Sequence, residues 1–269
     1  MATEAKKQRT GARPQALVTG ASTGIGAAFA ARLAHDGHDV IIVARSRPRL
    51  EALADRLHKA HGVTVKVVAA DLTDADALRR VERVVHDSEL DLLVNNAGFG
   101  TAGPFAHLGV AKEEEEIRLN VLALMRLTHA ALSGMIKRRR GAIINVSSLS
   151  AFQPMAFNAT YAATKAFVNS FTESLHEELR GTGVRVQALC PGFTRTEFQE
   201  RAGINASDVP GFAWMSPATV ADASLHALRR GNVICVPGLA NRALASVVGV
   251  LPRRVTRRVS GILGKRIQT

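Results

Sequence analysis

Apolar, β-branched runs alternate with amphipathic stretches along most of this chain, and this alternation limits its possible folds more than any other feature. Each run is nearly continuous in Val, Ile and Leu, as in strands that are covered on both faces. Repeated strand–helix alternation predicts right-handed βαβ units and a parallel, doubly wound α/β sheet with helices on both faces. We expect about seven strands, at Ala16–Gly20, Asp39–Arg45, Thr64–Leu72, Asp91–Gly98, Gly141–Ser148, Val184–Gly192 and Asn232–Gly238.

The stretches between these runs carry helix signals. Leu50, Leu53 and Leu57 recur at helical spacing. Thr73 opens the sequence "TDAD" and is the expected N-cap of the helix that follows it. Ser216 is followed by a proline, the pattern of an N-cap with Pro at the first helical position.

The 269 residues and the hydrophobic content of 46% suit one α/β domain with a full core. We expect this single domain over residues 15–240, because no repeat or linker divides it. Residues 1–14 are polar and basic, which favours a disordered lead-in over a secretory signal. No apolar run reaches the roughly 18 residues of a membrane span, and residues 241–269 form a basic, amphipathic C-terminal segment.

Basic charge is concentrated in that last part of the chain. No Asp or Glu follows Asp222, whereas nine Lys and Arg residues do, so this end carries most of the net charge of +12. A solvated, partly frayed terminus is the simplest interpretation. A peripheral helix on anionic lipid, a partner-binding helix and a helix that attracts an anionic thioester stay open. An apolar series recurs there at helical spacing: Val255, Val259, Ile262, Leu263 and Ile267.

The cysteines and the basic residues also argue against two classes of site. Cys190 and Cys235 are the only cysteines, and their strand-like surroundings predict buried thiols in a reducing, cytoplasmic compartment. Neither they nor the nine histidines have the spacing of a metal site, so we predict none. We predict no nucleic-acid binding, because the basic charge lacks a reading motif and interleaved aromatics.

The sequence "VTGASTGIG" (Val18–Gly26) follows the first expected strand and opens the first helix. Gly20, Gly24 and Gly26 allow close backbone approach, and the helix N-terminus offers free N–H groups to a pyrophosphate. An ordinary glycine-rich turn is the alternative, but the place of the loop in a βαβ unit favours dinucleotide binding.

The second and third strands end in residues that bear on which dinucleotide binds. Arg45 stands where a basic residue would accommodate a 2′-phosphate, which favours NADP(H) over NAD(H). A solvated loop arginine is the alternative. Asp71 ends the third strand, where it could bind the adenine amino group, cap the next helix, or do both.

Tyr161 is the only tyrosine of the chain, and Lys165 follows four residues later. On a helix these two residues share one face. Making a phenol anionic at pH 7 costs about 4 kcal/mol, and a nearby cation lowers that cost. A tyrosine tuned in this way could give a proton to a carbonyl oxygen or take one from an alcohol.

Two further polar residues complete this candidate catalytic set. Ser148 ends the fifth strand, and its hydroxyl could hold the same carbonyl oxygen. Asn120 interrupts an apolar helical face, so it must be hydrogen-bonded when buried. It is either a structural clip or part of a proton path through water.

Together these residues resemble the compact branch of the short-chain dehydrogenase/reductase family, and the motifs run in family order from about residue 15 to 238. The resemblance implies a Rossmann-like fold with Tyr161 as the general acid/base and Ser148 orienting the substrate. It implies that Lys165 holds the nicotinamide ribose and lowers the pKa of Tyr161, and that Asn120 anchors a water. Relatives usually pair through the helices around Tyr161 and Asn120, which implies a homodimer or homotetramer.

Two more motifs, "NNAG" (Asn95–Gly98) and "PGFTRT" (Pro191–Thr196), match the family. By resemblance the first stabilises the sheet beside the adenine ribose and the second wraps the nicotinamide. Beyond the catalytic set, in which Tyr161 and Lys165 would also touch the cofactor, the expected cofactor-binding residues are Gly20, Ser22, Thr23, Gly24, Ile25, Gly26, Arg45, Asp71, Leu72, Asn96, Ala97, Gly98, Pro191, Gly192, Thr194 and Thr196.

Two long loops should cover the site: Leu149–Asn158, and a lid within residues 193–216. Their aromatic and Met side chains favour an apolar ketone, aldehyde or 3-oxoacyl substrate, although several of them would pack the core. The leading hypothesis is an NADP(H)-dependent oxidoreductase of a carbonyl/alcohol pair. A non-catalytic NADP(H)-binding sensor or scaffold is the alternative, and a sugar-nucleotide epimerase or dehydratase is disfavoured by the chain length and glycine spacing.

Overall fold

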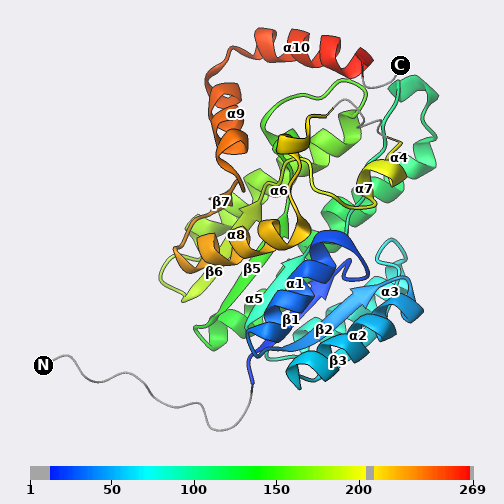
Figure 1. Ribbon diagram of the computed structural model, residues 1–269. Coiled ribbons are helices and arrows are strands. Elements are labelled where there is room, and N and C mark those ends of the chain that lie inside the picture. The colour runs from blue at the N-terminus through cyan, green and yellow to red at the C-terminus, as the bar shows by residue number, and fades with distance from the viewer. Residues whose placement is uncertain (1–12, 204–208, 267–269) are drawn as a thin grey trace, which may run out of the picture.

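The computed structural model describes residues 13–203 and 209–266. The predicted lead-in at residues 1–14 therefore falls almost entirely outside the described residues. Within these limits the chain forms a seven-stranded parallel sheet in the order β3-β2-β1-β4-β5-β6-β7 (Figure 1). The predicted doubly wound α/β class is confirmed.

The strands follow the predicted apolar runs, although β1 begins one residue earlier, at Gln15, and most strands are shorter than those runs. The last one is reduced to two residues, because only Ile234 and Cys235 of the predicted run pair with β6. The strands are β1 Gln15–Thr19, β2 Asp39–Ala44, β3 Val65–Ala69, β4 Leu92–Asn95, β5 Gly141–Val146, β6 Val184–Leu189 and β7 Ile234–Cys235.

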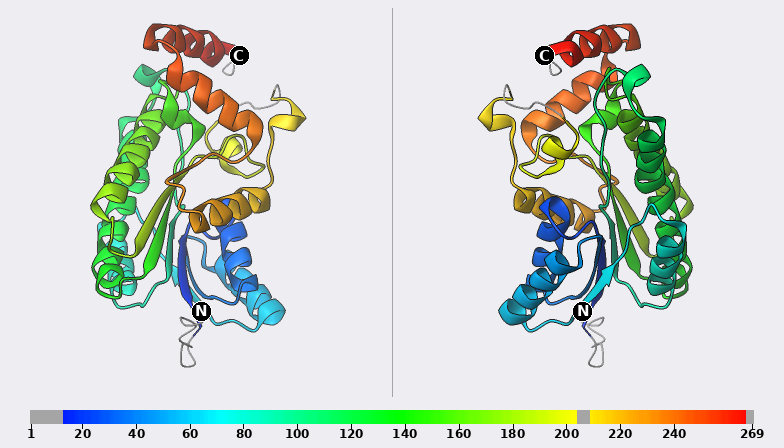
Figure 2. Two further views of the ribbon diagram at one scale, coloured as in Figure 1. Left: turned by 90° about the vertical axis from the view of Figure 1, so that its left-hand side faces the viewer. Right: turned by 90° about the vertical axis from the view of Figure 1, so that its right-hand side faces the viewer.

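Helices cover both faces of the sheet (Figure 2). One face carries α1 (Gly24–His35), α2 (Arg47–His61) and α8 (Pro217–Arg229), and the other carries α3 (Ala75–His86), α5 (Leu124–Lys137) and α6 (Ala159–Glu178). Neighbouring strand residues point to opposite faces, so Val18 packs in the first layer and Leu17 in the second. The order of the strands reverses between β1 and β4, and ligands of such sheets bind outside the carboxyl ends at that point.

Of the two predicted N-cap residues, Ser216 is confirmed and Thr73 is wrong. Ser216 caps α8 as expected, its side chain accepting from the Thr219 N–H at 3.0 Å. The N-cap of α3 is Asp74 and not Thr73, because the Asp74 carboxylate accepts from the Ala77 N–H at 2.7 Å. Thr73 instead donates its hydroxyl to Asp71.

One long helical segment, Val110–Lys137, joins α4 (Val110–Ile117), a wider π-helical turn (Arg118–Ala123) and α5. It is the one helix among the described residues that is long and apolar enough to cross a membrane by length and composition. Its apolar side chains pack on the sheet, with Leu127 and Met135 almost fully buried. The same segment buries Asn120, as expected of a core helix of this fold.

The C-terminal segment forms two helices, α9 (Leu239–Val250) and α10 (Arg253–Arg266). The predicted helix is present, and part of it is docked. Its polar side faces the protein, with Thr256 5% and Ser260 6% exposed. The Ser260 hydroxyl accepts from the Ala156 N–H at 2.7 Å. Three apolar residues of the predicted series face outward: Val255, Val259 and Ile262; Ile267 lies outside the described residues.

Short elements complete the carboxyl edge. They are η1 (Phe105–His107), η3 (Leu149–Phe152), α7 (Phe198–Arg201) and η4 (Gly211–Ala213). Thr194 and Met215 form an isolated β-bridge that ties the two ends of the lid together. The carboxyl ends of β1, β4 and β5 therefore open toward these loops, and the candidate site is built there.

Candidate active site

The loop between β1 and α1 is shaped for close approach by a ligand. Gly20 and Gly24 have φ of +63° and +58°, which side chains other than glycine rarely adopt. A Cβ at Gly26 would collide with the carbonyl of Gly20 and lie 2.5 Å from Asn96 Nδ2. Asn96 braces the loop by donating to the carbonyls of Thr19 and Gly20 at 2.9 and 3.2 Å. Bare backbone at a helix N-terminus fits a pyrophosphate.

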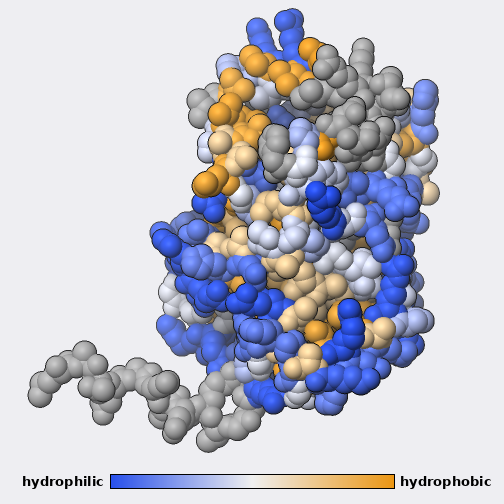
Figure 3. Space-filling view, viewed as in Figure 1, coloured by the Kyte–Doolittle hydropathy of each residue, from blue (hydrophilic) through white to orange (hydrophobic). Residues whose placement is uncertain are grey.

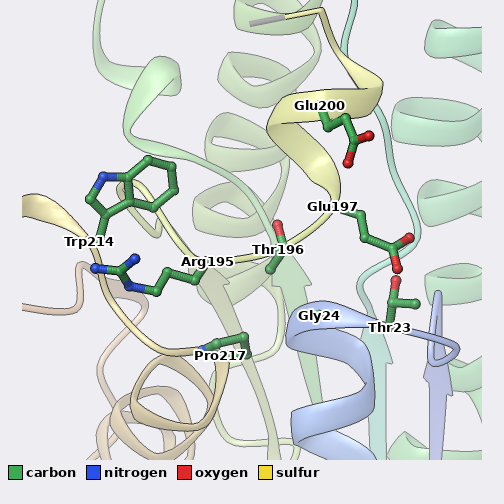
Figure 4. Close-up of a pocket in the computed structure, with 8 residues that line it drawn as sticks. All are labelled: Thr23, Gly24, Arg195, Thr196, Glu197, Glu200, Trp214 and Pro217. Atoms are coloured by element: carbon green, nitrogen blue, oxygen red, sulfur yellow. The ribbon is translucent and has the colours of Figure 1, made fainter. Parts of the chain in front are cut away.

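A cavity of about 570 Å³ lies over this helix N-terminus. Thr23 and Gly24 form one wall, and residues of the lid form the other (Figure 4). The two walls nearly touch, because a Cβ at Gly24 would lie 2.9 Å from Cγ2 of Thr196. Figure 4 also shows Arg195 extended toward Trp214, whose ring centroid lies 5.7 Å from the guanidinium carbon. The structure thus brings Thr196 to the glycine loop.

Arg45 and Asp71 lie at the carboxyl ends of β2 and β3, on the glycine-loop side of the switch point. Arg45 is exposed, as a residue that binds a phosphate from solvent would be. Burial by itself would raise the pKa of Asp71, but hydrogen bonds from Thr73 and the positive charges of Arg45 and Lys112 lower it. The expected capping of α3 by Asp71 is wrong, since Asp74 takes that position. Leu72 beside it is buried.

The "NNAG" motif braces the centre of the sheet, as the resemblance implied. Asn95 donates to Asn145 Oδ1 at 2.9 Å and to Thr128 Oγ1 at 3.0 Å, which joins β4, β5 and α5. The Ala97 N–H donates to Thr19 Oγ1 at 3.0 Å. Gly98 leaves room for two catalytic candidates, because a Cβ there would lie 2.9 Å from Asn120 Oδ1 and 3.5 Å from Lys165 Nζ.

Ser148, Tyr161 and Lys165 are brought together by β5 and α6. Tyr161 and Lys165 lie one turn apart on α6, and both are buried, 9% and 5% exposed. Ser148 lies close enough to the Tyr161 hydroxyl for its side chain to lower the pKa of that phenol. Lys165 Nζ donates to the Val146 carbonyl at 2.8 Å and lies 5.5 Å from the centroid of the Tyr161 ring. The spacing from Tyr161 to Lys165 thus produced the predicted cluster.

The pKa of Tyr161 moves in the direction opposite to the prediction. Burial is the main cause that raises it to about 12; the negative charge of Glu116 acts in the same direction, while the interaction with Ser148 lowers it. Burial also lowers the pKa of Lys165 to about 8. The prediction considered the attraction between phenolate and ammonium and left out desolvation, which dominates for both groups.

Asn120 is fully engaged as a clip. Its amide donates to the Phe99 carbonyl at 2.8 Å and to Thr164 Oγ1 at 3.2 Å, and its oxygen accepts from the Phe99 N–H at 3.1 Å. It lies within the π-helical turn, a feature often found at functional sites. Of the two alternatives, the structural clip is therefore the one that these hydrogen bonds describe. A role in a water path stays a prediction.

The "PGFTRT" segment and the lid close the site. The Pro191 carbonyl accepts from the Leu149 N–H at 3.0 Å, and Thr194 is buried. A Cβ at Gly192 would lie 2.8 Å from the side-chain amide of Asn241, so α9 packs directly on this segment. Phe198 of the lid lies against Tyr161, with 5.4 Å between ring centroids. The lid therefore shields the phenol, as an apolar substrate site requires.

Two buried acids beside the site were not predicted. The run "KEEEE" (Lys112–Glu116) looks like a solvated first turn of a helix, yet Glu113 and Glu116 are 5% and 0% exposed. The signal was present in the sequence, since Glu113, Glu116 and Asn120 are spaced three and four apart and share one helix face. Glu116 therefore belongs to the electrostatic surroundings of Tyr161 and Lys165.

Comparison with known proteins gives a family match and several similar proteins. Residues 14–206 match the family model described as short chain dehydrogenase. A short-chain dehydrogenase from Sphingobium yanoikuyae in complex with NADPH is 36% identical, with a TM-score of 0.80 over 89% of this chain and 97% of that one. A bulky-bulky ketone specific alcohol dehydrogenase from Comamonas testosteroni is 32% identical, with a TM-score of 0.76 over 89% of this chain and 95% of that one. The human very-long-chain 3-oxoacyl-CoA reductase is 34% identical over 186 residues, or 68% of this chain and 60% of that protein.

Proposed function

Since this chain belongs to the short chain dehydrogenase family of oxidoreductases, we propose that it interconverts a carbonyl and an alcohol on an apolar substrate with NADP(H). The observation that carries the proposal is the cluster of Ser148, Tyr161 and Lys165, with the tyrosine and the lysine buried at the sheet edge that also bears the glycine loop. A proton donor, a carbonyl-orienting hydroxyl and a cation then meet where a dinucleotide reaches.

The cofactor assignment rests on both ends of the cleft. The glycine loop presents N–H groups to the pyrophosphate, and exposed Arg45 at the end of β2 receives the 2′-phosphate of NADP(H). The NADPH complex of the Sphingobium relative supports the same choice. The bound cofactor supplies or accepts the hydride.

The protein's part is to orient the substrate and to move one proton. The hydroxyls of Ser148 and Tyr161 both point at one carbonyl oxygen, and the Tyr161 hydroxyl donates its proton to that oxygen during reduction. A pKa raised to about 12 keeps this phenol protonated at neutral pH, which suits reduction. One Lys165 hydrogen goes to Val146, and its other two remain for ribose hydroxyls.

The substrate class rests on the surroundings of Tyr161. Phe198 packs on its ring, and Phe193 and Trp214 of the lid lie 5.5 Å apart between ring centroids. The Comamonas alcohol dehydrogenase is specific for bulky ketones, and the human reductase acts on very-long-chain 3-oxoacyl-CoA. We therefore place an apolar ketone, aldehyde or 3-oxoacyl group against these rings.

An NADPH-oxidation screen over ketones, aldehydes and 3-oxoacyl thioesters tests the proposal. Turnover of an apolar carbonyl that disappears in Tyr161→Phe while NADPH still binds supports an enzyme. Unchanged behaviour of Tyr161→Phe in every assay would favour the alternative, a non-catalytic NADP(H) sensor or scaffold. Activity confined to small, highly polar sugars would contradict the apolar site.

We also propose a homodimer or homotetramer that pairs through α4 to α6. Five large apolar side chains are exposed on these elements. Analytical ultracentrifugation of the double variant Ile117→Ser/Leu122→Ser checks the assignment, and a wild-type chain that sediments as a monomer would refute it. The exposed residues are Val110, Ile117, Leu122, Ile136 and Phe167.

For the cell, we propose a cytoplasmic protein whose C-terminal helices contact anionic lipid. Both cysteines are buried free thiols, as suits a reducing compartment. Apolar side chains gather over α9 and α10 in Figure 3, and nine Lys and Arg residues with no acid follow Asp222. Binding to vesicles with anionic lipid, but not to neutral ones, is expected; Val255→Ser/Val259→Ser should weaken it. Equal binding by this variant would contradict the contact.

A further inference from the structure

Two carboxyl groups are buried behind the tyrosine and lysine. Glu113 and Glu116 lie one turn apart on α4, with exposures of 5% and 0%. Acidic side chains are almost never fully buried unless a partner compensates their charge. A buried acidic pair beside a catalytic cluster therefore requires an explanation.

Only one of their four oxygen atoms has a hydrogen-bond partner among the described residues. Glu116 Oε2 accepts from the Thr101 hydroxyl at 2.9 Å. Glu116 Oε1 and both oxygens of Glu113 are buried and unpaired within the part of the chain that the structure describes. A buried carboxylate with an unpaired oxygen is costly to keep ionised, so Glu116 holds a proton more readily than an exposed glutamate does.

A short loop connects Glu116 to the catalytic cluster. Thr101, which holds Glu116, follows Gly100, and a Cβ at Gly100 would lie 2.9 Å from the Tyr161 ring. A Cβ at Gly98 in the same loop would lie 3.5 Å from Lys165 Nζ. The Thr101 carbonyl also accepts from the side chain of Asn158, the residue before α6. Glu116 thus lies directly behind the wall of the site.

The charged and titratable groups around Glu116 come from two helices. Glu113 shares its helix, and Lys165 and Tyr161 face it from α6; the Cys190 thiol, which follows β6, acts on Tyr161 and Lys165. Burial raises the pKa of Cys190 to about 12, so that thiol stays neutral. Lys112 is turned onto the Phe99 ring, 4.6 Å from its centroid. Lys165 is therefore the cation that a charged Glu116 most directly stabilises.

We propose that Glu116 is a positioning residue of this site, whose buried carboxylate holds Lys165 as an ammonium and Tyr161 as a phenol. The inference rests on the proposed function, since it assigns a role to Glu116 in that chemistry. A negative charge at Glu116 opposes a phenolate and favours the protonated amine. Both effects favour the state that donates a proton to a carbonyl. Burial, with help from Glu113, also raises the pKa of Glu116 to about 7, so its charge changes near neutral pH.

The single tyrosine makes this directly measurable without turnover. A chain labelled with ¹³C at the tyrosine ζ-carbon gives one signal, that of Tyr161. In Glu116→Gln we expect this signal to begin its shift to phenolate at least roughly one pH unit below wild type, as loss of a nearby charge in the interior predicts. Glu114→Gln on the exposed side of the same helix should match wild type. Superimposable titrations for Glu116→Gln and wild type would overturn the proposal.

Two further readouts separate this outcome from misfolding and from failure of the proposed function. In wild type labelled at the glutamate δ-carbon, one signal, that of Glu116, should titrate near pH 7; titration of every glutamate between pH 4 and 5 would overturn the proposal even if Glu116→Gln does not fold. In the NADPH assay, the basic limb of the pH profile of kcat/KM should shift to lower pH in Glu116→Gln, by the same roughly one pH unit as the tyrosine titration. The KM for NADPH should stay within about twofold of the wild-type value. If no substrate is found, the tyrosine titration still decides.

Discussion

The glycine loop and the tyrosine–lysine cluster face the same cleft and are built in different ways. The loop offers half-buried backbone, and its shape is fixed by residues without a side chain, such as Gly20 and Gly24. The cluster offers buried side chains, and the protonation of Tyr161 depends on an acid of another helix, Glu116. Ligand binding at the glycine loop therefore depends on room for the ligand beside the backbone. Proton transfer at the tyrosine–lysine cluster depends on the charges buried around it.

Tyr161→Phe should separate the two regions most sharply. Removal of the phenolic proton is expected to lower kcat by about 10³-fold, the usual scale for a general acid. NADPH affinity, measured by fluorescence titration, should stay within about twofold, because the ring and the glycine loop are unchanged. Loss of NADPH binding in this variant would show that the two regions are not separable.

Glu116→Gln tests whether the buried carboxylate beside the tyrosine–lysine cluster lowers the free energy of unfolding. A raised carboxyl pKa means that the folded chain keeps a proton that the unfolded chain has lost between pH 4.5 and about 7. Wild-type stability should therefore fall by about 3 kcal/mol as the pH rises through that window. The variant should show no such fall.

Urea unfolding at pH 5 and pH 7.5 measures the difference. Both values lie below about pH 8, where the lowered pKa of Lys165 begins to matter, and above that value stability should rise with pH until the ordinary value of 10.5. Equal slopes for wild type and Glu116→Gln between pH 5 and 7.5 would contradict a buried, titrating Glu116.

Gly26→Ala tests whether cofactor binding requires the close backbone packing of the glycine loop. The added Cβ collides with the Gly20 carbonyl and crowds Asn96. Such overpacking costs about 2 kcal/mol, so NADPH affinity should fall roughly 30-fold. kcat at saturating cofactor should change little. Gly109→Ala is the matched control, since a Cβ there meets nothing within 4 Å, and an equal loss in both variants would remove the argument from close approach.

Arg45→Ala should give the smallest effect. Loss of one charge-assisted contact to the 2′-phosphate should weaken NADPH roughly tenfold and leave NADH unchanged. The ratio of kcat/KM for the two cofactors measures it. An unchanged ratio would leave Arg45 as a solvated loop arginine, the alternative that its exposure also allows.

The sequence predicted features that depend on local pattern. Seven strands, the parallel sheet, the glycine loop and the Ser148–Tyr161–Lys165 cluster follow from periodicity and from fixed spacing along single elements. Features that depend on packing were missed or predicted incorrectly. No role was predicted for Glu113 and Glu116, because the charges of the run "KEEEE" dominate its pattern and their burial, with Thr101 against Glu116, arises only in the folded chain.

The pKa of Tyr161 was mispredicted for the same reason. Spacing brings Lys165 near the phenol, but desolvation depends on every element packed around the ring, including Gly100 and Phe198. In the C-terminal segment the spacing of the apolar residues indicated a helix, but spacing alone left open what the helix contacts. Ser260 accepts from a backbone N–H of the loop before Tyr161, and Thr256 on the same side of the helix is buried.

The docking of Ser260 on Ala156 has a practical consequence for handling this protein. The tail touches the stretch of chain between Ser148 and Tyr161, whereas β1 begins at the opposite end of the molecule from these loops (Figure 2). A fusion partner or affinity tag attached after Thr269 could disturb the contact between α10 and the loop that precedes Tyr161. Tags belong at Met1, and kinetic constants from carboxyl-tagged material should be checked against tag-free protein.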